Sequence, residues 1–173
     1  DVPTVGDGGV ADDLMSITWK ISEGILWSDG TPFTSADVKF TYEYCTDPES
    51  GCAQATKSEG VSSAETPDDL TVVVNFDSPT PFPYGPFVGG ESPIIQAAQF
   101  ADCMGARAPE CTDENFGPIG TGPFVVTDFR TNDVIQLVAN ENYREEGKPA
   151  FASMTFKGSG KTSLCQSHLQ RWW

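Results

Sequence analysis

Histidine is almost absent from this chain, because among its 173 residues only His168 is one, close to the C-terminal end. No serine or cysteine therefore has a plausible base nearby to activate it as a nucleophile. The paired carboxylates Asp12–Asp13, Asp68–Asp69 and Glu145–Glu146 are adjacent in sequence. Adjacent side chains point apart, so these pairs are expected to be solvated charge rather than acid/base pairs. We predict no catalytic residues and no enzyme.

Recognisable metal and cofactor motifs are also missing. There is no D-x-D-x-D-G loop of the kind that binds Ca²⁺. The stretch Gly158–Ser163 resembles the end of a phosphate-binding loop, but the position of its first glycine is occupied by Thr155. Too few residues follow Thr162 to complete a nucleotide-binding fold. We therefore expect no metal and no cofactor.

Basic residues are scarce, since 10 Lys and Arg face 25 Asp and Glu and the net charge is −15. Such an acidic surface repels phosphate backbones, so nucleic acid is excluded as a partner. No apolar run approaches the roughly 20 residues of a membrane span. Asp1 opens a polar, Gly-rich stretch without the basic and apolar regions of a signal peptide, and we expect the chain to begin inside a longer protein.

Cysteine, by contrast, is frequent. Four of the five cysteines form two close pairs, Cys45 with Cys52 and Cys103 with Cys111, each flanking a polar loop. We predict two local disulfides, which indicate an oxidising periplasmic or extracellular setting. Free thiols are one alternative. A metal site is another, weakened because neither pair is C-x-x-C and His168 lies far away.

Hydrophobic periodicity predicts an α+β fold, with a mainly antiparallel sheet and a few helices. We expect residues 1–12 to form a loop or flexible N-terminal segment, and residues 46–69 and 105–122 to be exposed connections. Strands are predicted at 16–21, 70–76, 123–129, 134–139 and 152–157, the third and fourth forming a hairpin. Helices are predicted at 35–45 and 93–104, with Pro93 in the first turn of the second.

The most informative stretch is Trp27–Glu43. Asp29-Gly30 is a turn dipeptide, Pro32 stiffens the exit, and Thr34 or Ser35 can cap a helix whose first turn contains Asp37. Together with the strand before it, this stretch resembles the motif of the family 5 extracellular solute-binding proteins, the peptide and nickel-chelate receptors of ABC importers. A second block, Gly120–Phe124 followed by Asn140-Glu141-Asn142-Tyr143, is similar to that family's "GTGPY … N-x-x-Y" block.

The resemblance covers about residues 13–160 and implies a two-lobed periplasmic-binding-protein-like fold. Residues 13–160 would be part of lobe one, residues 1–12 a flexible segment and residues 161–173 a divergent tail. It also implies a receptor that captures an oligopeptide or similar small solute and delivers it to ABC permease subunits. Such a receptor is periplasmic or extracellular, and contacts the membrane only through the permease or a lipid anchor missing here.

The matched residues are turn and cap residues, so we expect them to build the lobe, and we assign no ligand contacts. They are Asp29, Gly30, Pro32, Thr34, Asp37 and Gly120–Pro123. Trp27, Tyr84 and Phe87 are expected in the core rather than in a cleft.

One alternative function remains: an independent, secreted, disulfide-bonded interaction module without a role in transport. It would act through the Pro/aromatic loop at 78–87 or through Trp172 and Trp173 at the basic C-terminal tail. A proline-rich run can bind SH3-like or WW-like partners. We favour a structural role for this loop, in which it holds its aromatic side chains in the core.

Overall fold

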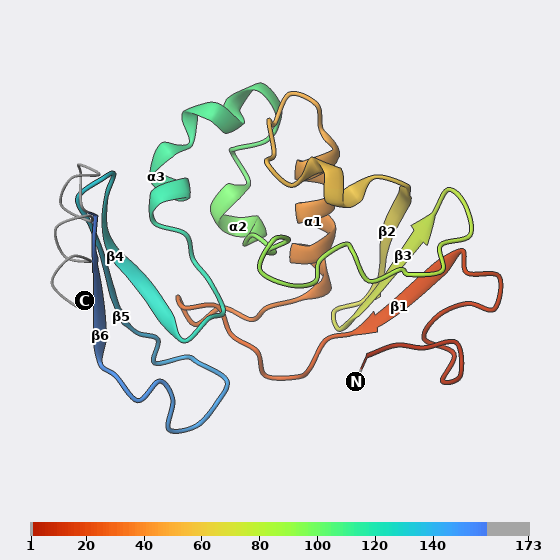
Figure 1. Cartoon of the computed structure of the whole chain (residues 1–173), viewed down its shortest axis with the longest axis horizontal. Coiled ribbons are helices and arrows are strands. Elements are labelled where there is room, and N and C mark those ends of the chain that lie inside the picture. The colour runs from red at the N-terminus through yellow and green to blue at the C-terminus, as the bar shows by residue number, and fades with distance from the viewer. Residues whose placement is uncertain (1, 159–173) are drawn as a thin grey trace, which may run out of the picture.

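The computed structural model describes residues 2–158 and contains two three-stranded antiparallel sheets with helices between them (Figure 1). The predicted α+β fold is confirmed, although the strands form two sheets. The elements are β1 (Ser16–Lys20), α1 (Ser35–Thr46), η1 (Ala55–Ser58), β2 (Val61–Asp68), β3 (Thr71–Phe76), α2 (Ala97–Phe100), η2 (Gly105–Glu110), α3 (Thr112–Phe116), β4 (Phe124–Arg130), β5 (Val134–Ala139) and β6 (Ser153–Lys157). Within residues 2–158 no helix has the length and apolar character needed to cross a membrane.

The first sheet has the order β1-β3-β2 and carries the main hydrophobic core. β3 lies in the centre because its run of β-branched residues suits a strand that is paired on both sides. Val74 is fully buried and pairs with the equally buried Ile17 of β1. Val38 of α1 belongs to the same cluster, so the helix packs on this sheet through its apolar stripe.

β2 was not predicted, since residues 46–69 were expected to be an exposed connection. The strand presents only two buried residues to the core, Val61 and Ala64, and the rest are polar. It lies at the edge of the sheet, where Pro67 is tolerated, and its register with β3 is irregular. The turn comes at residues 69–70, directly after the strand. A polar edge strand of this kind lacks the hydrophobic alternation on which strand prediction relies.

The N-terminal segment makes contacts that a frayed end would lack. Val10 is 3% exposed, belongs to the core cluster and pairs with Ile17. The Thr18 amide donates a hydrogen bond to the Gly9 carbonyl (2.7 Å). The hydroxyl of Tyr84 donates to the Pro3 carbonyl (2.8 Å), which joins this segment to the Pro/aromatic loop.

The segment from 93 to 116 also differs from the prediction. Helix α2 is a single turn, and Pro93 precedes it in chain without regular secondary structure rather than occupying its first turn. Residues expected to form a loop fold into η2 and α3 instead. A second core cluster, centred on Tyr44, Phe100 and Cys103, lies between α1 and this segment.

Both predicted disulfides, Cys45–Cys52 and Cys103–Cys111, are present. The first connects the end of α1 to the loop before η1, and the second spans η2. Cys45 and Cys103 belong to the second core cluster. The bonds therefore hold short helical segments that have little core of their own. Cys165, His168 and the tail at 161–173 lie outside the described residues, as does most of the loop at 158–163.

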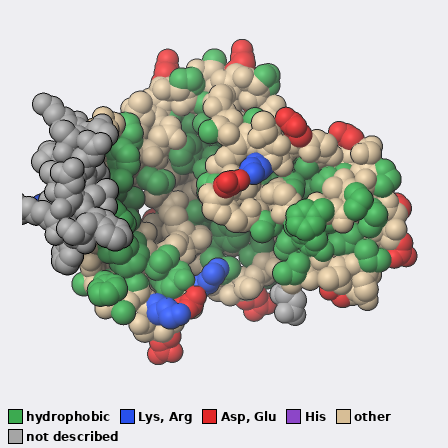
Figure 2. All heavy atoms as spheres, viewed as in Figure 1, with side chains coloured by type: hydrophobic (Ala, Val, Ile, Leu, Met, Phe, Trp, Pro, Cys, Tyr) green, Lys and Arg blue, Asp and Glu red, His purple; other side chains and the backbone are tan. Residues whose placement is uncertain are grey.

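The second sheet has the order β4-β5-β6 and stands apart from the first (Figure 1). The predicted hairpin and final strand are confirmed by the pairing of β5 with both neighbours. Its side chains are poorly covered: Phe156 is 56% exposed, and Phe129 and Val138 are also exposed. Figure 2 shows apolar side chains along this sheet, beside the hollow that separates it from the helices. Among the described residues, both core clusters belong to the other half of the molecule.

The carboxylate of Asp37, in the first turn of α1, connects three separate segments. It accepts hydrogen bonds from Trp27 Nε1 (3.2 Å), from the Thr34 amide (3.0 Å) and from the Ala97 amide (2.9 Å). Asp37 and Trp27 are both buried. The motif therefore does more than begin a helix, because it also positions the loop before α1 and the start of α2.

We predict that Asp37→Ala lowers the free energy of unfolding by roughly 3 kcal/mol, because a hydrogen bond to a charged group contributes about 1.5–3 kcal/mol and three donors lose their acceptor together. Asp37→Asn, which keeps one acceptor oxygen, should cost less. Glu43→Ala is the control, since Glu43 lies on the same helix with a half-exposed side chain. Urea denaturation of the full chain measures all three, and equal losses for Asp37→Ala and Glu43→Ala would contradict the prediction.

The disulfides give a second prediction. Reduction of the denatured chain should raise its intact mass by about 4 Da, two hydrogens for each bond. In Cys103→Ser/Cys111→Ser the rise should be about 2 Da, and the free energy of unfolding should fall by about 2 kcal/mol, as expected for a short closed loop. A mass that does not change on reduction would show that the bonds are absent.

Candidate functional site

The two sequence blocks that carry the family resemblance meet in space. The Ser28 amide, beside the first turn, donates a hydrogen bond to the Gly120 carbonyl (2.9 Å). Asn142 Nδ2 donates to the Ser28 carbonyl (3.1 Å), and Asn140 Nδ2 donates to the Gly122 carbonyl (2.8 Å). The two bonds at Ser28 join residues 92 and 114 positions apart and connect the two halves of the molecule, whereas the bond from Asn140 lies within the second block.

The first turn is held rigid by its own aspartate. Asp29 Oδ1 accepts hydrogen bonds from the Thr31 hydroxyl (2.6 Å) and the Thr31 amide (2.9 Å). Its other oxygen accepts one from the side-chain amide of the buried Gln96 (2.8 Å). The hydroxyl of Thr31 and the amide of Gln96 hold the pKa of Asp29 below its ordinary value, because they stabilise the ionised form. Gly30 has φ 86°, a conformation that favours glycine.

A cavity of about 570 Å³ lies between these segments. It has the size of typical small-molecule sites, which run from about 300 to 1,000 Å³. Its walls are residues of the loop at 25–33, the loop at 87–94, Gly120–Gly122 and Arg144. Four separate stretches of the chain therefore form one site.

The polar groups of this cavity suit an anion. Arg144 is exposed, and it has no ion pair within residues 2–158. Within residues 2–158, the backbone amides of Gly120, Thr121 and Gly122 donate no hydrogen bond. A side chain added at Gly122 would meet no atom within 4 Å, so open space adjoins this loop. Neighbouring amides with a guanidinium are the groups that bind carboxylate or phosphate oxygens.

Trp27 and the aromatic residues of the Pro/aromatic loop differ in how they are placed. Trp27 is buried, and Tyr84 and Phe87 pack against the core cluster, as expected. Trp27 and Phe87 also line the 570 Å³ cavity, so the expected choice of core rather than cleft does not hold for these two residues. Phe82 differs, because it is 75% exposed and contacts only the edge of Tyr84 among the aromatic rings described here. The Pro/aromatic loop therefore holds only part of its aromatic set in the core.

The sequence prediction treated Gly120–Pro123 as lobe-building residues alone. In the structure Gly120–Gly122 also line the cavity, and Arg144, which was not singled out, lies there as well. Arg144 follows Tyr143 directly, so its closeness to the "N-x-x-Y" block was the only available signal.

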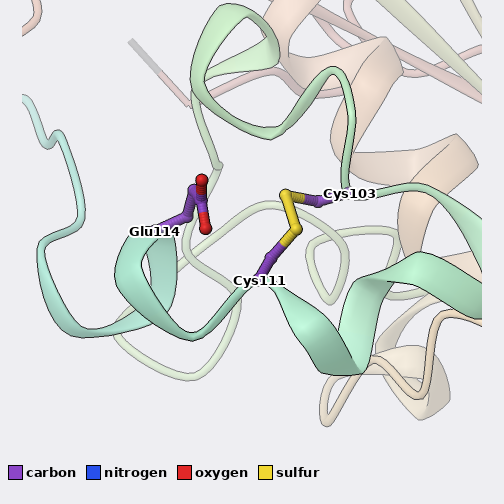
Figure 3. A group of neighbouring side chains, drawn as sticks. All are labelled: Cys103, Cys111 and Glu114. Carbon is purple, nitrogen blue, oxygen red and sulfur yellow. A yellow bond between two sulfur atoms is a disulfide. The ribbon is translucent and has the colours of Figure 1, made fainter.

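Cys103, Cys111 and Glu114 form the one group in the described chain with metal-ligand spacing (Figure 3). The two sulfur atoms and a carboxylate oxygen all lie within 4.8 Å of one another. The sulfur atoms are bonded to each other, however, and a metal requires free thiolates. In its oxidised form this group is a structural disulfide beside a carboxylate.

Comparison with known proteins gives concordant results. The sequence model of the family "Bacterial extracellular solute-binding proteins, family 5 Middle" matches residues 6–164. An ABC transporter peptide-binding protein of Brucella ovis is 31% identical over 144 residues, which are 81% of this chain and 26% of that protein. Heme-binding protein A of Haemophilus influenzae is 31% identical over 152 residues, 78% of this chain and 27% of that protein.

The fold is similar to that of solved binding proteins. The oligopeptide-binding protein AppA of Bacillus subtilis, in complex with a nonapeptide, superposes with a TM-score of 0.79 at 23% identity. The match covers 94% of this chain and 32% of AppA. The chain thus spans about a quarter of the length of these curated relatives.

Proposed function

The chain belongs to family 5 of the bacterial extracellular solute-binding proteins, and we propose that it supplies part of the first lobe of an ABC importer's substrate-binding protein. The relatives named above are described as binding peptide and heme. For this chain we propose an oligopeptide or a similar small solute that carries a carboxylate.

The observation that carries this proposal is the cavity between the two family blocks. It brings the Gly120–Gly122 amides and Arg144 to one place, next to the apolar rings of Trp27 and Phe87. A peptide offers matching chemistry, with a terminal carboxylate for the amides and guanidinium and apolar side chains for the rings. The backbone of the site is held by Asp29 and Asp37, so it is formed before the solute arrives.

Binding by such a receptor involves closure of two lobes around the solute. Because the chain spans about a quarter of its relatives, we propose that the opposite wall of the site comes from sequence outside these residues. The receptor would then deliver its solute to permease subunits in the membrane. Its family is described as extracellular, and a periplasmic location, with or without a lipid anchor, is our more specific proposal.

An independent interaction module is the second candidate, and the exposed ring of Phe82 is the observation in its favour. Such a module would bind a protein partner through the Pro/aromatic loop and would not depend on Arg144. A variant of Arg144 therefore distinguishes the two functions, because only peptide binding depends on that residue.

We predict that Arg144→Ala weakens the binding of free-carboxylate peptides about tenfold or more, the usual effect of losing a charge-assisted hydrogen bond. Peptides with an amidated C-terminus should bind more weakly to the wild-type protein and respond little to the substitution. Peptide affinity is measured by isothermal titration calorimetry with short peptide pools. The protein is taken as its host makes it, so that it includes any sequence that flanks these residues.

Arg107→Ala is the matched control, because Arg107 is exposed on η2, away from the cavity. It should leave peptide affinity unchanged. Equal loss in both arginine variants, or equal binding of free and amidated peptides, would rule out carboxylate recognition at Arg144. If no peptide binds and a Phe82→Ala change abolishes capture of a protein partner, the interaction-module reading is correct.

A further inference from the structure

A second cavity, of about 380 Å³, lies at the C-terminal end of α1. Its walls come from α1, from the loop at 50–54, from residues 93–95 and from the segment between α2 and α3. Among the described residues, Pro93 alone lines both this cavity and the 570 Å³ cavity. The two cavities are therefore separate sites, and a ligand in one does not require a ligand in the other.

The walls of the 380 Å³ cavity carry no charge. Among the described residues that line it there is no Asp, Glu, Lys, Arg or His, although the whole chain has a net charge of −15. The rings of Tyr44 and Phe100 and the Cys45–Cys52 disulfide form apolar parts of the wall. An ion that entered would lose hydration without gaining a charged partner. The cavity therefore suits an uncharged molecule.

Tyr44 brings a hydroxyl without a hydrogen-bond partner to this cavity. The residue is only 9% exposed, and its hydroxyl makes no hydrogen bond within residues 2–158, whereas the hydroxyls of Tyr42, Tyr84 and Tyr143 each donate one. No fully enclosed side-chain oxygen or nitrogen in the described chain lacks a partner, so this hydroxyl is reached from the cavity that Tyr44 lines. Burial raises the pKa of Tyr44, which keeps the hydroxyl protonated and able to donate.

Further donors lie in the loop at 50–54, which also lines the cavity. Ser50 is 5% exposed, and its hydroxyl accepts a hydrogen bond from the Gly105 amide (3.1 Å) but donates none to the described residues. Nor do the amides of Gly51, Cys52 and Ala53 donate within this part of the chain. The disulfide at Cys52 closes the loop, so these donors are held in place before a ligand arrives.

We propose that the 380 Å³ cavity binds a small uncharged molecule that has an apolar ring and an oxygen acceptor, with the acceptor hydrogen-bonded to the Tyr44 hydroxyl. The volume lies within the range of small-molecule sites, about 300 to 1,000 Å³. The ring of the ligand would pack against Phe100, and its oxygen would receive the donors of Tyr44 and Ser50. A buried donor without an acceptor costs free energy, and the ligand oxygen removes that cost.

Three fluorinated probes of similar size test this site by ¹⁹F NMR titration into the protein as its host makes it. The ketone 4-fluoroacetophenone has the required ring and acceptor. In 4-fluoro-α-methylstyrene a CH₂ group replaces the ketone oxygen, and 4-fluorobenzoate carries a negative charge. We expect saturable binding of the ketone with a Kd of about 1 mM or tighter, the level that a fragment of about ten heavy atoms reaches. The benzoate should bind at least about tenfold more weakly than the ketone.

Tyr44→Phe removes the hydroxyl and keeps the ring. It should weaken ketone binding about three- to tenfold, the effect of losing one neutral hydrogen bond, and should leave styrene binding unchanged. Tyr42→Phe is the matched control, because the Tyr42 hydroxyl donates to the Val61 carbonyl and Tyr42 does not line the cavity. It should change the affinity of neither probe.

A second pair of variants tests the cavity without touching a buried residue. Ala53 is exposed and lines the cavity, so Ala53→Trp should obstruct it and abolish binding of both ketone and styrene. Ala55 is also exposed but does not line the cavity, and Ala55→Trp should bind both probes as the wild type does.

Several results would overturn the proposal. They are the absence of saturable ketone binding, equal affinity for ketone and benzoate, equal loss of ketone and styrene binding in Tyr44→Phe, and ketone binding that survives Ala53→Trp. Loss of binding in Tyr42→Phe or Ala55→Trp would also overturn it, because the effect would then be general. Peptide affinity is independent of all these outcomes, since neither Tyr44 nor Ala53 lines the 570 Å³ cavity.

Discussion

The buried carboxylate of Asp37 is the interaction on which the rest of the site depends. A buried charge is costly unless hydrogen-bond donors surround it, and here the donors come from three segments. The Trp27 indole, the Thr34 amide and the Ala97 amide all converge on it. The loop at 25–33 and the segment leading into α2 are thereby fixed relative to α1. Both contribute walls to the cavity, so the shape of the site depends on the hydrogen bonds that the Asp37 carboxylate accepts.

A separate set of contacts connects the two halves of the molecule. It includes the hydrogen bonds among Ser28, Gly120 and Asn142, together with the stacked rings of Phe116 and Phe129. Beyond these contacts the second sheet keeps apolar side chains at its surface (Figure 2). The site lies where the halves meet, which is where ligand pockets commonly form.

In the family blocks, the internal hydrogen bonds and the proposed recognition groups use different atoms. In the first block, the side chains of the exposed Asp29 and the buried Asp37 accept hydrogen bonds from other parts of the protein. In the second block, the carbonyls of Gly120 and Gly122 accept internal hydrogen bonds, while the amides of Gly120–Gly122 have no donor role in the described structure. Acceptors are thus used for folding, while the donors are the groups that the proposed function assigns to the solute.

Local sequence by itself determined the elements with a strong repeat or a stop signal. The β-branched run of β3, the hairpin of β4 and β5, the capped start of α1 and both short-range disulfides were all predictable, because each depends on neighbouring residues. The polar edge strand β2 and the anchored N-terminal segment were not, because their place depends on pairing with strands distant in sequence. The site belongs to this second class. Arg144 and Phe87 are ordinary residues in the sequence, and only the tertiary structure brings them to one cavity, through long-range hydrogen bonds that no local pattern encodes.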